Sequence, residues 1–135
     1  MEFITWSDQL SVGVKHFDEE HKKLISFVND LNHALVVGSA QKTMGDILHN
    51  LLEYTKIHFR HEEEYMLLHD YGNFAAHKGE HDALASQVVD FYDRFKSGKG
   101  SFSIELLIFL RDWLVNHIQG TDMKYRAFFE SKNVR

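Results

Sequence analysis

Four segments of the sequence repeat apolar residues at alternating intervals of three and four, the spacing of one face of an α-helix. The most regular runs from Phe74 to Phe95, and short breaks that contain glycine separate the segments. The chain has no proline, so long uninterrupted helices are possible. After an irregular arm over residues 1–17, we expect helices at about 18–37, 41–69, 74–96 and 103–131.

The connections between the expected helices are only a few residues long. Short connections favour helices that run antiparallel to their neighbours in the sequence. A chain of 135 residues is the size of one domain and is long enough to bury a real core. The sequence therefore predicts an all-α protein, a single domain over residues 1–135 that folds as an up-down-up-down four-helix bundle.

The composition excludes several classes of protein. The net charge is −5 and no basic run is present, so nucleic acid is not an expected partner. Cysteine is absent, so a metal could be held only by imidazole and carboxylate groups. The start has no apolar leader, and no apolar run approaches the roughly 18 residues typical of a membrane span. We therefore expect a cytoplasmic protein without a membrane span.

Six polar residues occupy stripe positions where leucine is usual. For any one of them, a hydrogen-bonded place in the core explains the position equally well. Without a partner, each buried group would cost about 1 to 3 kcal/mol, and a bound cation removes that cost by using the lone pairs. Six such residues from four helices, facing one interior, indicate a metal site: His21, His58, Glu62, His77, His81 and His117.

The spacing within two of the helices supports this interpretation. His58 and Glu62 are four residues apart, as are His77 and His81, so each pair lies on one helix face about a turn apart. Each motif alone is common by chance. Together, and with single histidines on the other two helices, they form a much stronger signal.

Asp122 does not fit a regular helix. It follows His117 by five residues, which on an ideal α-helix turns it by roughly 140° onto a different face. Periodicity alone therefore favours a solvent-exposed Asp122. A π-type turn over Gln119–Gly120–Thr121 would instead bring the carboxylate inward, and such turns are frequent at functional sites.

The pattern from Trp6 to about Tyr125 resembles the hemerythrin family, specifically the single-domain bacteriohemerythrins. It comprises Trp6, Gly13, the DEEH ending at His21, HxxxE at His58, HxxxH at His77 and HxxxxD at His117. The resemblance implies two non-haem iron ions with an oxo or hydroxo bridge. One iron would be held by His77, His81 and His117 and the other by His21 and His58, while Glu62 and Asp122 bridge both.

The resemblance reverses the expectation for Asp122 and also implies a function. Dioxygen would bind at the iron of His21 and His58, which has one ligand fewer. Trp113, Leu114 and Ile118 would line the oxygen pocket, although all three are also compatible with an ordinary helix core.

Reversible dioxygen binding, for storage, delivery or scavenging, is the favoured function, so the chain is not expected to be an enzyme. A redox enzyme acting on peroxide, nitric oxide or ferrous iron is an alternative, as is an oxygen or redox sensor. The sequence does not separate these alternatives, and it identifies no protein partner. The remaining histidines and two glutamates are expected to face solvent: His16, His33, His49, His61, His69, Glu63 and Glu64.

Overall fold

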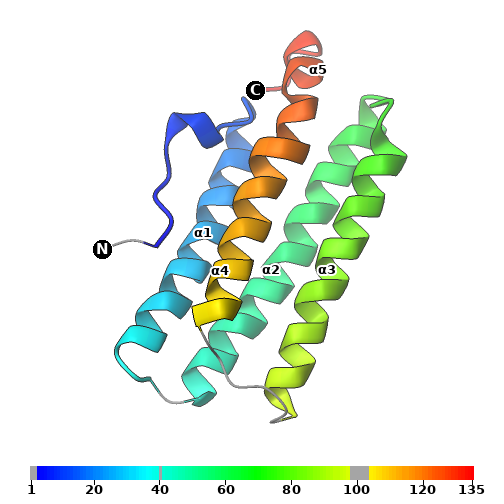
Figure 1. Ribbon diagram of the computed structural model, residues 1–135. Coiled ribbons are helices and arrows are strands. Elements are labelled where there is room, and N and C mark those ends of the chain that lie inside the picture. Colours follow the sequence, from blue (N-terminus) through cyan, green and yellow to red (C-terminus); the bar gives the residue numbers. More distant parts are fainter. Residues whose placement is uncertain (1–2, 40, 98–103) are drawn as a thin grey trace.

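Four long helices lie side by side and alternate in direction along the chain (Figure 1). The computed structural model describes residues 3–39, 41–97 and 104–135. The helices are α1 (Lys15–Val36), α2 (Gln41–Leu68), α3 (Phe74–Lys96) and α4 (Ile104–Asn116), and the described residues contain no strand. The predicted all-α four-helix bundle is confirmed. None of the described helices is both long and apolar enough to cross a membrane.

The last helix is interrupted, unlike the single helix expected over 103–131. After α4 the chain forms a π-helical turn over His117–Thr121, called the π turn below, and then a 3-10 segment over Asp122–Tyr125. A short final helix, α5 (Arg126–Ser131), follows at the end of the bundle where α1 begins (Figure 1). The expected start at residue 103 lies outside the described residues.

Residues in the left-handed backbone region end the first two helices. Gly38, with φ of +70°, follows α1, and the N–H of Ser39 donates to the carbonyl of Ala34 at 2.8 Å. Glycine in this conformation commonly ends a helix. After α2 the left-handed residue is Asp70, with φ of +57°. Asp70 can take this role because aspartate tolerates the region better than most residues.

The N-terminal arm is fixed to α1 by side-chain hydrogen bonds. Asn29 accepts from the N–H of Ile4 at 2.8 Å and donates to its carbonyl at 2.9 Å. Asp18 accepts from the hydroxyl of Ser11 at 2.6 Å and from the N–H of Val12 at 2.8 Å. The helix α1 starts at Lys15, three residues before the expected position.

Candidate metal centre

Seven polar side chains meet in the bundle interior, and all of them are buried. His21 comes from α1, His58 and Glu62 from α2, and His77 and His81 from α3. The remaining two, His117 and Asp122, lie at the start of the π turn and directly after it. The structure thus brings together all seven residues that the sequence and the resemblance selected.

Three of the histidines form one group around the two carboxylates. Nε2 of His77 lies 3.0 Å, and Nε2 of His117 3.1 Å, from Oδ1 of Asp122. Nε2 of His81 lies 3.1 Å from Oε1 of Glu62. Each of these five residues offers one ligand atom, and all five atoms lie within 4.8 Å of one another. The group is therefore compact enough to hold one metal ion.

The other two histidines form a second group that shares the same carboxylates. Nε2 of His21 lies 3.0 Å from Oδ2 of Asp122 and 3.7 Å from Oε2 of Glu62. Nε2 of His58 lies 3.3 Å from Oε1 of Glu62. The first group offers five protein ligands and the second offers four. The two positions are therefore adjacent, share Glu62 and Asp122, and differ by one ligand.

The buried donor atoms of this cluster fit metal ions. Among the described residues, Nε2 of all five histidines and both carboxylate oxygens of Asp122 are buried without a hydrogen-bond partner. Each buried polar group left in this state costs about 1 to 3 kcal/mol. A cation uses these lone pairs directly, and sets of imidazole and carboxylate ligands suit iron, zinc and manganese. The cluster is thus able to bind metal.

The π turn explains how Asp122 reaches the cluster. Its N–H donates to the carbonyl of His117, five residues earlier, so the two residues share one helix face. Gly120 lies within this turn. The expectation from a regular helix, that Asp122 faces solvent, is therefore wrong. The alternative, a π-type turn that brings the carboxylate inward, is present.

Comparison with known proteins agrees with this geometry. Residues 12–128 match the family model described as the hemerythrin HHE cation binding domain. The chain belongs to the hemerythrin family. It is 35% identical over 126 residues to a bacteriohemerythrin of Methylococcus capsulatus, covering 93% of this chain and 95% of that protein. It is 34% identical over 125 residues to a bacteriohemerythrin of Stenotrophomonas maltophilia, covering 93% of this chain and 80% of that protein.

A solved structure extends the likeness to three dimensions. A crystal structure of wild-type hemerythrin matches this chain with a TM-score of 0.87 at 34% identity, covering 93% of this chain and 96% of that one. The resemblance inferred from the ligand spacing is therefore confirmed for both sequence and fold.

In this member of the hemerythrin family, two further carboxylates hold the outer nitrogens of the imidazoles. Nδ1 of His58 donates to Oε1 of Glu20 at 2.8 Å, and Nδ1 of His81 donates to Oε2 of Glu63 at 2.8 Å. Such contacts fix the orientation of a ring and leave Nε2 free for a metal. The expectation that Glu63 faces solvent is wrong, because only 17% of its side chain is exposed. Glu64 is exposed, as expected.

The sequence contains a signal for these two carboxylates, but it lies beside the apolar stripe of each helix and not within it. Glu20 directly precedes His21, and Glu63 directly follows Glu62. A residue next to a stripe position is turned by about 100° around the helix, which aims it at the neighbouring helix. An acidic residue there can reach the outer nitrogen of a histidine on that helix, as Glu63 does with His81.

Tyr125 orients one of the shared carboxylates. Its hydroxyl is completely buried and donates a short hydrogen bond to Oε2 of Glu62. Burial, followed by the nearby charges of Asp122 and Glu62, raises the pKa of Tyr125 well above its usual value. The phenol therefore keeps its proton and stays a donor. The sequence analysis assigned no role to Tyr125.

The shared carboxylate Glu62 also raises the pKa of His58 when no metal is bound. Burial opposes a charge on His58, but attraction to Glu62 and the hydrogen bond to Glu20 outweigh it and raise the pKa of His58 to about 10. The pKa of Glu62 is in turn lowered: burial opposes this, but the charge of His58 and the contacts with His21, His58 and His81 together outweigh it. A proton on His58 thus supplies positive charge beside Glu62 when no metal is bound.

Metal loading is therefore expected to release protons. Because the pKa of His58 is raised to about 10, its ring carries a proton on each nitrogen at pH 7. A metal ion must displace the proton on Nε2, so we expect the release of at least one proton per chain at pH 7. The release can be measured with an indicator dye in weak buffer while ferrous ion is added without air. The contribution of His58 declines as the starting pH approaches 10. Loading at pH 7 without the release of any proton would contradict the assignment.

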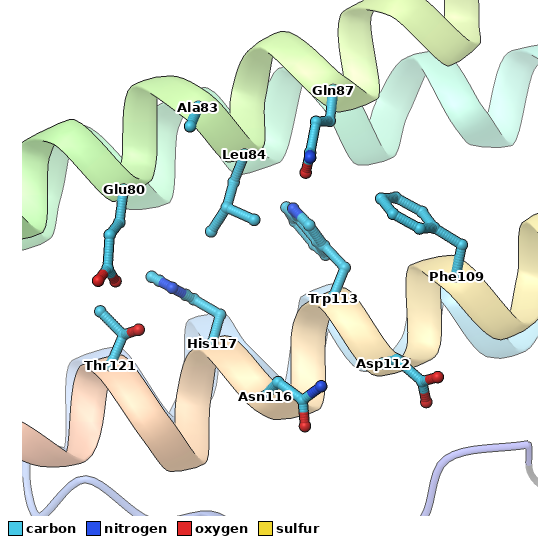
Figure 2. A pocket seen from close by; sticks show the side chains of 10 residues that line it. All are labelled: Glu80, Ala83, Leu84, Gln87, Phe109, Asp112, Trp113, Asn116, His117 and Thr121. Atoms are coloured by element: carbon cyan, nitrogen blue, oxygen red, sulfur yellow. The ribbon is translucent and has the colours of Figure 1, made fainter.

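A groove of about 490 Å³ lies between α3 and α4 beside the three-histidine group. Leu84, Trp113 and His117 point into the space between the two helices (Figure 2). Of the three residues assigned to an oxygen pocket, only Trp113 lines this groove, whereas Leu114 and Ile118 are buried in the core. A shared oxygen pocket formed by these three residues stays a prediction.

Proposed function

We propose that this chain binds dioxygen reversibly at two iron ions, for oxygen storage, delivery or scavenging. His77, His81 and His117 would hold one iron, and His21 and His58 the other. Glu62 and Asp122, together with an oxo or hydroxo group, would bridge the pair. When bound, two ferrous ions supply the two electrons that dioxygen accepts on binding.

The observation that carries this proposal is the unequal ligand count of the two groups. Five protein ligands face one position and four face the other, and both positions share Glu62 and Asp122. A single small molecule could therefore add at one position, beside His21 and His58, without displacing a protein ligand. Burial of every ligand supports the same view, because a site closed to water limits side reactions of bound oxygen.

The ligand types favour binding over oxidation of a substrate. Di-iron carboxylate proteins built on similar bundles use four glutamates and two histidines. The centre here offers five imidazoles and only two carboxylates. Neutral ligands stabilise high oxidation states of iron less than carboxylates do, so the iron should be a weaker oxidant of other molecules.

The test is a cycle of oxygen addition and removal. Protein loaded with ferrous iron without air is exposed to dioxygen, its visible spectrum is recorded, and the solution is then purged with inert gas. We expect an oxygen-dependent absorption band that appears and disappears over repeated cycles at two irons per chain. Irreversible oxidation in the first cycle, with release of hydrogen peroxide, would overturn the carrier function and favour a redox enzyme.

Replacing Leu114 with alanine is expected to accelerate oxidation of the iron by air. Leu114 is fully buried and lies one helical turn before His117, so its loss opens a cavity that water can enter. The substitution should also lower the free energy of unfolding by about 2 to 5 kcal/mol, as for other buried leucines. The measurement is the rate at which the oxygenated spectrum decays.

Leu110→Ala is the matched control for this change. Leu110 is equally buried in α4 but lies one turn further from His117. It should destabilise the bundle by a similar amount and leave the decay rate close to that of the unmodified protein. Equal acceleration in both variants would show that Leu114 has no special role in an oxygen pocket.

A further inference from the structure

We propose that the chain has a second, outer binding site for a divalent transition-metal ion, formed by His16 and Glu20 of α1 and His61 of α2. This outer site is separate from the seven residues of the centre. Spacing along the chain does not group these three residues, and both histidines were expected to face solvent.

The three side chains converge on one carboxylate oxygen. Nδ1 of His61 lies 2.5 Å, and Nε2 of His16 3.6 Å, from Oε2 of Glu20. His16 and Glu20 are one turn apart on the same helix face, and His61 approaches from the neighbouring helix. Their ligand atoms all lie within 4.8 Å of one another. Small rotations of the two rings would therefore let one ion bind all three.

The rings of the outer site are held by their neighbours. His16 stacks on Tyr65 with ring centroids 6.3 Å apart and planes inclined by 17°, and its ring lies 5.4 Å from that of His61. Exposure falls from 53% for the side chain of His16 to 32% for His61 and 6% for Glu20. An ion can thus enter from solvent and meet a buried carboxylate behind two ordered imidazoles.

The ligand chemistry selects the class of ion. Two imidazoles and one carboxylate suit Zn²⁺, Fe²⁺, Mn²⁺ and similar ions, whereas Mg²⁺ and Ca²⁺ prefer oxygen ligands alone. Three protein ligands also leave coordination positions for water, as in sites that exchange their ligands. The outer site should therefore hold its ion less tightly than the centre and release it more readily.

The outer site is linked to the centre through Glu20. While Oε2 of Glu20 faces His16 and His61, Oε1 accepts the hydrogen bond from Nδ1 of His58, one of the histidines of the centre. An ion at the outer site would attract the negative charge of Glu20, the same carboxylate that accepts the hydrogen bond from His58. Occupation of the outer site should therefore alter the hydrogen bond to His58 without any change in the ligands of the centre.

Zinc titration of the iron-loaded protein tests the proposal. Iron and zinc are counted by elemental analysis after each addition, and the heat of binding is measured by calorimetry. We expect one zinc ion per chain to bind while the iron content stays constant. Because the iron content is measured separately, failure of the outer site is distinguishable from failure of the centre.

Variants assign the bound ion to these residues. His16→Ala and His61→Ala should each weaken zinc binding by about tenfold or more. His33→Ala, which removes an exposed histidine elsewhere on α1, is the matched control and should leave binding unchanged. Circular dichroism checks that each variant keeps its helix content. The proposal is overturned if zinc enters only by displacing iron, if no zinc binds, or if His16→Ala binds it as well as the unmodified chain.

Discussion

Replacing Glu62 with glutamine is expected to leave the protein unable to hold metal at either position of its centre. Oε1 of Glu62 lies 3.1 Å from Nε2 of His81, and Oε2 lies 3.7 Å from Nε2 of His21, so one carboxylate serves both groups. The amide of glutamine removes the charge and one of the two ligand oxygens. Iron per chain, measured after anaerobic loading and desalting, should fall from two to nearly none.

The neighbouring residue provides a matched control. Glu63 contacts the outer nitrogen of His81 and offers no atom to the centre, and the oxygen of a glutamine can still accept that hydrogen bond. Glu63→Gln should therefore keep both irons at saturation and weaken their affinity by no more than about 10-fold to 100-fold. Complete loss of iron in Glu63→Gln, or full retention in Glu62→Gln, would show that the ligand assignment is wrong.

Removing the metal is expected to lower the melting temperature by on the order of 10 °C or more. The metal-free chain buries the Nε2 atoms of five histidines without hydrogen-bond partners. At about 1 to 3 kcal/mol for each such group, several kcal/mol of stability depend on the bound ions.

Thermal unfolding followed by circular dichroism measures this effect. The protein is compared before chelation, after chelation and dialysis, and after iron is returned without air. Recovery of the melting temperature on reloading would show that the loss comes from the metal and not from damage to the chain. An unchanged melting temperature in the chelated protein would mean that the buried donor atoms find other partners.

The bundle and most of the candidate centre could be predicted because both depend on spacing within single helices. The stripe through His77, His81 and Phe95 has one period along its whole length, and α3 forms where that period predicts it. His58 and Glu62 share a face for the same reason. Local periodicity therefore predicts the helix face of any residue whose position depends on its own helix alone.

The rest of the site depends on contacts between helices, and the residue spacing within one helix does not predict such contacts. Glu20, Glu63 and Tyr125 act on residues from other elements, and only the packing of the bundle brings them close. The direction of Asp122 depends on a local departure from the α-helix, so the family resemblance succeeded where periodicity failed. His16 and His61 were expected in solvent because each lies off the stripe of its own helix.

The π turn has a consequence for the whole end of the bundle. The extra residue changes the phase of every position after it, so Tyr125 faces Glu62 and Phe129 packs against Phe17. Arg126, next in the chain, donates to the carbonyl of Ser11 in the N-terminal arm. The same local irregularity thus brings Asp122 into the candidate centre and places α5 beside the N-terminal arm, so the geometry of the centre and the packing at this end of the bundle depend on the same turn.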